Sequence, residues 1–287
     1  TPPLYNPDME MNVDRCYQAL LTHDARFDGR FFVGVASTEI YCRPVCPART
    51  PRRENCAFFP SAAAAEKAGF RPCMRCRPEL APGNARVDAV GRLASAAAGR
   101  IEEGALTGRG VEALAAELGV TDRHLRRVVQ SELGVSPIEL AQTQRLLLAK
   151  RLLTDTRLPV IEVAFASGFA SVRRFNALFR ARYRLSPRAL RKARSSGEME
   201  AVLACEVAYR PPLAWKPLIA FLERRAIAGV EAIEGGRYMR TVAVGGTRGW
   251  IAVGRSKGRN TLQVELSVSL APVLPSVLAR VKRLFDL

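Results

Sequence analysis

The chain has 287 residues, of which 48% are hydrophobic, and a formal net charge of +17 at pH 7 with the histidines counted as neutral. This length suffices for two or three domains, and a sequence pI near 10.4 favours a polyanionic partner. The sequence has no apolar run of the roughly 18 residues that a spanning helix needs, which argues against a membrane protein.

The positive charge is concentrated in the middle of the sequence. Residues 1–80 have a net charge of +2, residues 81–194 of +10 and residues 195–287 of +5. We therefore expect the middle segment to make the main contact with a polyanion. The first five residues, 1–5, lack the apolar core of a signal peptide, which predicts a cytoplasmic protein without a membrane partner.

Two pairs of closely spaced cysteines occur in the first segment. Cys42 and Cys46 form a Cys-x3-Cys pair, and Cys73 and Cys76 form a Cys-x2-Cys pair. Each pair can hold one side of a tetrahedral metal from a tight turn, and four thiolates favour zinc. The sequence therefore predicts one zinc ion per chain. The remaining cysteines stand alone and are expected to be small buried side chains: Cys16, Cys56 and Cys205.

Arginines surround both cysteine pairs, so this segment attracts phosphate groups. They are Arg43, Arg49, Arg52, Arg53, Arg71, Arg75 and Arg77. The common interpretation of a four-cysteine cluster is a structural zinc site. A zinc site beside DNA leaves a second interpretation open, in which one of the sulfur atoms is itself the reagent.

An internal repeat with an offset of 49 to 50 residues occupies the middle segment, which has a helical pattern throughout. Residues 112–120 match residues 162–169, and each stretch contains a glycine followed by a helix start, at Thr121 and at Ser171. An arginine-rich helix comes next in each copy. This order of helix, glycine turn and capped helix is typical of a helix-turn-helix unit, whose second helix enters the major groove of DNA.

The second helices of the two units have the same phasing. The residues expected in the core are Leu125, Val128, Val129, Phe175, Leu178 and Phe179. Those expected to face outward are Arg123, Arg126, Arg127, Arg173, Arg174 and Asn176. One such helix is commonly a solvated basic face, but two in matching phase favour DNA binding. Residues 137–153 are predicted to form one helix that holds the two units about one turn of DNA apart.

From about residue 200 the pattern changes to that of strands. Strands are predicted at 238–244, 249–253 and 261–266, and helices at 215–226 and 273–285. Residues 78–84 and 192–197 are predicted linkers. The predicted fold class is multidomain: a small α+β zinc domain at 1–80, an all-α double helix-turn-helix domain at 81–194, and an α+β domain at 195–287.

Essentially the whole chain resembles known families. Residues 12–80 resemble the amino-terminal zinc domain of Ada, a bacterial sensor of DNA methylation damage. Residues 85–192 resemble the paired helix-turn-helix domain of AraC-type regulators, and residues 200–287 resemble the amino-terminal domain of AlkA, a glycosylase of alkylated DNA bases. The matching stretches are, in chain order, 27–29, 41–44, 53–55, 69–78, 168–171, 186–187, 221–226 and 283–287.

The resemblance implies roles for single residues. Cys42 would be the methyl acceptor, and Cys46, Cys73 and Cys76 its companion zinc ligands. The residues assigned to DNA contact, besides the outward faces of the two second helices, are Thr38, Arg43, Arg49, Arg71, Arg75 and Ser171.

The function implied is a single-turnover methylphosphotriester-DNA–cysteine methyltransferase. Methyl transfer from DNA to Cys42 would be irreversible and would activate transcription in an adaptive response to alkylation. The implied partners are double-stranded DNA, at methylated backbone and promoter sites, and RNA polymerase. The implied location is the nucleoid in the bacterial cytoplasm.

Two parts of the related families do not occur in this sequence. The Pro-Cys-His-Arg motif of a second Ada methyltransferase domain is absent, and so is the helix-hairpin-helix domain that follows in AlkA. Neither repair of methylated guanine nor base excision is therefore expected from these residues. Two alternatives stay open: an AraC-type regulator with a purely structural zinc domain, and the non-catalytic amino-terminal portion of a bifunctional methyladenine DNA glycosylase.

Overall fold

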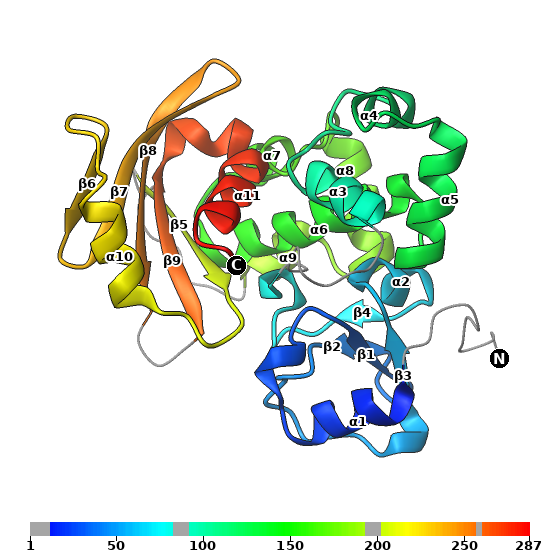
Figure 1. Ribbon diagram of the computed structural model, residues 1–287. Coiled ribbons are helices and arrows are strands. Elements are labelled where there is room, and N and C mark those ends of the chain that lie inside the picture. Colours follow the sequence, from blue (N-terminus) through cyan, green and yellow to red (C-terminus); the bar gives the residue numbers. More distant parts are fainter. Residues whose placement is uncertain (1–11, 83–91, 193–201, 257–259) are drawn as a thin grey trace.

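A computed structural model describes residues 12–82, 92–192, 202–256 and 260–287 (Figure 1). It confirms the multidomain fold class, with a small α+β domain, a helical region and a sheet domain in chain order. The start of the sequence, and residues 83–84 and 193–197 of the predicted linkers, lie outside the described residues. Among the described helices, none combines the length and the apolar character needed to cross a membrane.

The first domain is a small sheet between two helices. Its elements are α1 (Val13–Leu21), β1 (Phe32–Val35), β2 (Ile40–Cys42), β3 (Cys56–Phe59), α2 (Ala62–Lys67) and β4 (Arg71–Pro72), with 3-10 turns η1 (Ala25–Phe27), η2 (Arg53–Asn55) and η3 (Pro78–Leu80). The strand order is β3-β1-β2-β4. Neighbouring residues of β1 point to opposite faces, so Val33 packs with α1 while Phe32 packs on the side of α2. The predicted linker at 78–84 begins with η3, and this part of the prediction was wrong.

The helical region contains the predicted repeat. Its helices are α3 (Arg92–Glu102), α4 (Val111–Glu117), α5 (Asp122–Leu133), α6 (Pro137–Asp155), α7 (Val160–Ala166), α8 (Val172–Tyr183) and α9 (Pro187–Lys192). The first unit is α4 and α5, and the second is α7 and α8. Gly119 and Gly168 lie after α4 and α7 at φ +71° and +83°, a left-handed conformation that glycine adopts at little cost. The predicted connecting helix is α6, with a capping box at Ser136 and Glu139.

The predicted core of the two units is largely confirmed. Leu125, Val129, Phe175 and Phe179 are fully buried. Val128 and Leu178 are only half-buried. The helical phase read from the sequence therefore places the apolar residues inside and leaves the arginines on the other face.

The last domain is an antiparallel sheet with two helices. Its elements are β5 (Val202–Ala208), α10 (Trp215–Glu223), β6 (Glu231–Glu234), β7 (Arg237–Val244), β8 (Thr247–Arg255), β9 (Thr261–Ser267), η4 (Val268–Val273) and α11 (Leu274–Leu284). The strand order is β5-β9-β8-β7-β6. The three predicted strands correspond to β7, β8 and β9, and the two predicted helices to α10 and α11; β5 and β6 were not predicted.

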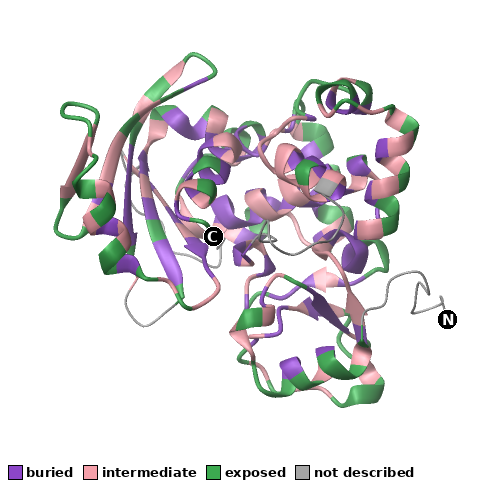
Figure 2. Ribbon diagram, viewed as in Figure 1, coloured by how far each residue is buried: buried purple, intermediate pink, exposed green. Residues whose placement is uncertain are grey.

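The two largest hydrophobic cores cross the domain divisions, whereas three smaller clusters are built from the first part of the chain. One core joins the second half of α6 and the second helix-turn-helix unit to the last domain, and includes Leu146, Phe175, Leu203 and Val277. Another joins the first half of α6 and the first unit to α2 of the first domain, and includes Leu140 with Ala63 and Ala64. Figure 2 shows buried residues running from the sheet across α11 into the helices. Helix α6 is thus shared by both cores.

The cysteines outside the four-cysteine cluster differ from one another. Cys16 and Cys205 are buried, as predicted. Cys56 is only half-buried, and its thiol donates a hydrogen bond to the Arg52 carbonyl at 3.3 Å. The prediction of a buried Cys56 was therefore wrong.

Candidate metal centre and nucleic-acid interface

Strand pairing brings the two cysteine pairs together. Strands β2 and β4 are parallel, with Tyr41 opposite Pro72, so the residues that follow at their carboxyl ends are neighbours. Cys42 is the last residue of β2, and Cys73 directly follows β4. The Cys73 amide donates to the Tyr41 carbonyl at 3.0 Å, which continues the pairing up to the cysteine.

Tight turns return the second cysteine of each pair to the first. The Cys46 amide donates to the Arg43 carbonyl at 3.1 Å, which closes the first turn. Two backbone amides donate to sulfur: that of Arg43 to Cys76 Sγ at 3.4 Å, and that of Arg75 to Cys73 Sγ at 3.3 Å. Such bonds favour the thiolate form because they stabilise negative charge on sulfur.

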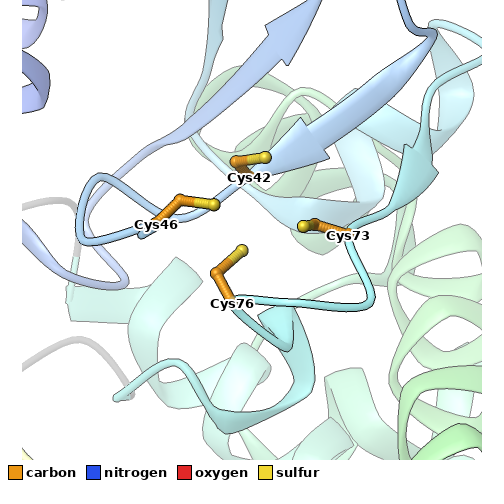
Figure 3. A group of neighbouring side chains, drawn as sticks. All are labelled: Cys42, Cys46, Cys73 and Cys76. Carbon is orange, nitrogen blue, oxygen red and sulfur yellow. The ribbon is translucent and has the colours of Figure 1, made fainter. Parts of the chain in front are cut away.

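The four sulfur atoms converge on one point, as Figure 3 shows, and all lie within 4.8 Å of one another. Sulfur atoms at about 2.3 Å from a tetrahedral zinc would be about 3.8 Å apart, so the cluster fits the ion with little adjustment. Hydrogen bonds among the thiols, with Cys46 foremost, and burial raise the pKa of the Cys42 thiol above its usual range. Four thiolates this close together repel one another, so a bound cation is needed to hold them all ionised. The site is a zinc site.

Cys42 differs from its companions in exposure. Cys46, Cys73 and Cys76 are buried, whereas Cys42 is only half-buried. The four groups that could hold the metal are nevertheless all buried, so the exposure of Cys42 as a residue does not place its sulfur at the surface.

The residues predicted to contact DNA around the cluster fall into two groups. Thr38, Arg49 and Arg75 are exposed. Arg71 is half-buried, and its buried Nε has no hydrogen-bond partner among the residues that the structure describes. Arg43 is buried: its guanidinium forms two hydrogen bonds to Asp28 and donates to the Cys76 carbonyl at 3.1 Å. In this structure the Arg43 side chain braces the cysteine turns and does not face the solvent.

Both second helices of the helix-turn-helix units begin at a side-chain cap. The Thr121 hydroxyl accepts from the His124 amide at 3.3 Å, and the Ser171 hydroxyl accepts from the Arg174 amide at 3.4 Å. Each cap satisfies an amide that the helix leaves unbonded. Ser171, assigned to DNA contact from the sequence, has an exposed side chain that serves as this cap.

The predicted outward residues of the two helices are mostly exposed. Exposed side chains belong to Arg123, Arg127, Arg173, Arg174 and Asn176. Arg126 is half-buried and pairs with Asp122 at 3.0 Å and Glu112 at 3.3 Å. Within the described part of the chain, no ion pair is found for Arg173 or Arg174 of α8, whereas the basic face of α5 is partly neutralised by the pairs of Arg126.

Sequence reasoning missed the buried charges near the metal site. They are Asp28, Glu66, Glu79 and Lys150, each with a partner far away in sequence or on another element. Lys150 and Glu79, at 2.5 Å, are 71 residues apart. No local sequence pattern predicts that these charged residues are buried, because charged residues are ordinarily exposed to solvent.

Comparison with known proteins covers all three parts. The family described as "Metal binding domain of Ada" matches residues 15–79, "Helix-turn-helix domain" matches 114–193, and "AlkA N-terminal domain" matches 204–287. The chain is 38% identical to a probable bifunctional transcriptional activator/DNA repair enzyme AlkA of Mycobacterium tuberculosis, over 97% of this chain and 57% of that protein. The chain thus spans little more than half the length of this relative.

Two further relatives match parts of the chain. The bifunctional transcriptional activator/DNA repair enzyme AdaA of Bacillus subtilis is 31% identical over 64% of this chain and 85% of that protein. DNA-3-methyladenine glycosylase 2 of Escherichia coli is 39% identical over 28% of each chain. With this coverage of AdaA and the match to the metal binding domain, the chain belongs to the Ada family, whose matched members are named as bifunctional transcriptional activators and DNA repair enzymes.

Proposed function

We propose that this chain is a sensor of DNA alkylation damage. It would accept a methyl group from a DNA methylphosphotriester on Cys42 and then activate transcription of adaptive-response genes. The observation that carries the proposal is the cluster of four convergent cysteines, beside the exposed Arg49 and Arg75. The names of the two bifunctional relatives support it.

The proposed reaction is a direct displacement. Bound zinc supplies the positive charge that keeps the cluster thiols ionised at neutral pH. The Cys42 sulfur attacks the methyl carbon, the sulfur–carbon bond forms as the carbon–oxygen bond breaks, and the electron pair stays on the phosphate oxygen. The DNA product is an ordinary phosphodiester anion, and no general base is needed. Because the thioether is not easily cleaved, each molecule would act once.

Exposed cations beside the cluster would position the damaged backbone. Arg49 and Arg75 have exposed side chains near the cysteine turns, and Thr38 lies exposed between β1 and β2. Arg71, with an unpartnered Nε, is a further candidate for a phosphate contact. A methylphosphotriester has lost its own charge, so these cations would bind the flanking phosphates and bring the neutral ester to the sulfur.

Methylation would also act as an electrostatic switch. Four thiolates and a zinc dication carry a formal charge of −2, which becomes −1 when Cys42 is methylated. One unit charge at contact distance is worth up to roughly 4 kcal/mol at an effective dielectric near 20, and less after screening by salt. Loss of that repulsion from the DNA phosphates would tighten promoter binding.

The helical region would read the promoter. We propose that α5 and α8 lie in successive major grooves, and that their outward arginines contact bases and phosphates. In this proposal the chain consists of a methyl-acceptor domain at 1–80, a DNA-reading domain at 81–194 and an AlkA-like domain at 195–287. RNA polymerase would be the partner that the activated form engages.

The experiment is to mix the protein with DNA that carries methylphosphotriesters and to measure its intact mass. We expect a gain of about 14 Da, mapped to Cys42, because only one thiolate displaces one methyl group. Cys42→Ser should abolish the gain. Cys56→Ser is the matched control, since Cys56 is also half-buried but lies outside the cluster, and it should leave the gain unchanged.

Two results would contradict the proposal. A methyl group on Cys46, Cys73 or Cys76 would show that another sulfur is the acceptor. No methyl on any cysteine of the zinc-loaded protein would leave the regulator with a structural zinc domain.

A further inference from the structure

We propose that Lys150, from the helix that joins the two helix-turn-helix units, is the counter-charge of the zinc site and positions Cys73. The metal centre would then be completed by the DNA-reading region and not by residues 1–80 alone. The proposal concerns metal binding and does not depend on methyl transfer.

The Lys150 side chain extends from its helix to the cysteine turns. It lies on α6, and its ammonium donates to the Cys73 carbonyl at 3.4 Å and to Glu79 Oε2 at 2.5 Å. Its side chain is only 2% exposed, and that of Glu79 only 1%. Burial of an ammonium costs free energy unless the group is paired and hydrogen-bonded. The contacts with Glu79 and with the Cys73 carbonyl therefore hold Lys150 in this position. Cys73 is a predicted ligand, and a bond to its carbonyl fixes the turn that carries its sulfur.

Lys150 belongs to a network of ion pairs that connects the first domain with α6. Glu79 also accepts from Arg77 Nε at 3.0 Å, Arg77 pairs with Asp155 at 2.7 Å, and Arg151 lies 4.0 Å from Asp155. Arg151 in turn donates to the Glu206 carbonyl of β5. Glu66 also interacts with Lys150. Lys150 is the cation of this network that contacts a cysteine turn, so its ammonium is placed to offset part of the formal −2 of the zinc-loaded cluster.

The arrangement has the form of an outer-shell interaction in a metal site. Removal of a residue that hydrogen-bonds to a metal-ligating residue commonly lowers metal affinity by about 10–100-fold. Lys150 supplies both functions of such a partner here, since its hydrogen bond orients the ligand and its charge offsets that of the thiolates. Because Lys150 belongs to α6, the charge of the metal site acts directly on the helix between the two readers.

The test uses the full chain with Lys150→Met, which keeps length and removes the charge. Zinc affinity, measured by competition with a chelator, should fall about 10–100-fold. In the cobalt-substituted protein the thiolate-to-metal charge-transfer bands should move to longer wavelength, because loss of a cation raises the energy of the sulfur electrons. Lys150→Arg should restore most of the affinity and the band position.

Two variants separate a charge effect from loss of packing. Lys67→Gln removes another ion pair between the first domain and α6, with Glu139 at 3.2 Å, and should change neither readout. Glu79→Gln removes the carboxylate and leaves the Lys150 charge in place, so zinc affinity should not fall. Unchanged affinity and bands in Lys150→Met would overturn the proposal. A loss of zinc affinity in Glu79→Gln or Lys67→Gln as large as that in Lys150→Met would also overturn it. If Lys150→Met does not fold, a loss of zinc affinity in Glu79→Gln is enough to overturn it.

Discussion

The buried carboxylate of Glu66 offers a sharp test of the interface between the first domain and the helical region. Glu66, on α2, accepts from the Tyr41 hydroxyl at 3.0 Å and from the Thr143 hydroxyl at 3.1 Å, and lies 3.6 Å from Arg182. Burial raises the pKa of Glu66 to about 7, against the opposing effects of Arg182, the two hydrogen bonds and Lys150. The perturbation we choose is Glu66→Gln, which keeps the shape and removes the titration.

The sign and size of the effect follow from the two pKa values. The folded protein binds this proton more tightly than the unfolded chain, whose carboxyl titrates near 4.5. The contribution of Glu66 to stability should therefore decline as pH rises from about 4.5 to about 7, and then stay level. A shift of this size corresponds to about 3 kcal/mol, of which about 2 kcal/mol falls between pH 5.5 and 8.

The assay is urea unfolding of the zinc-loaded proteins between pH 5.5 and 8 at fixed ionic strength. The difference between Glu66→Gln and wild type should shift by about 2 kcal/mol in favour of glutamine across this range, because the other titrating groups cancel. Glu139→Gln is the control. Although burial raises its pKa, hydrogen bonds from Ser136 and Lys67 bring the pKa of Glu139 below its usual value, so its difference should be flat here. A flat or opposite trend for Glu66→Gln would refute the reasoning.

Two further predictions concern the metal site and the reader. Asp28→Asn should lower the free energy of unfolding by about 3–5 kcal/mol in urea, because it leaves the buried Arg43 guanidinium without its counter-charge. Asp24→Asn should change the free energy of unfolding little, because the side chain of its partner Arg26 is 78% exposed and stays hydrated, and equal effects of the two variants would contradict the argument. Arg173→Ala should weaken promoter binding by about 1–3 kcal/mol if Arg173 contacts a base. If Arg173 contacts a phosphate, the same change should weaken binding to all DNA and reduce its salt dependence. Arg224 is an exposed arginine of the last domain, and Arg224→Ala should have neither effect. Unaltered binding of Arg173→Ala at every salt concentration would remove this residue from the interface.

The features predicted from sequence are those with a local signature. The cysteine spacings indicated the cluster, and the repeated pattern around Gly119 and Gly168 indicated both helix-turn-helix units with their phase. Helix α6 was predicted at 137–153 and runs two residues further. In each case the chemistry or the period lies within a short window, so no knowledge of distant contacts was needed.

The features that were missed depend on partners distant in sequence. Strand β5 pairs with β9, so Val202 is opposite Ser267, and its own residues give no clear alternation of polar and apolar side chains. Strand β6 is a short edge strand. In the sequence Arg43 looked like the other arginines near the cysteines, because its burial depends on Asp28, which no spacing rule connects to it.

The two hydrophobic cores have a consequence for how the protein can be divided. Each core combines segments from two sequence families, and α6 contributes its first half to one and its second half to the other. A fragment made by cutting at a family boundary would keep only part of a core, and would expose apolar surface such as that around Leu203 and Val277. A cut within or beside α6 would therefore disturb both of these cores, because the two halves of this one helix belong to different cores.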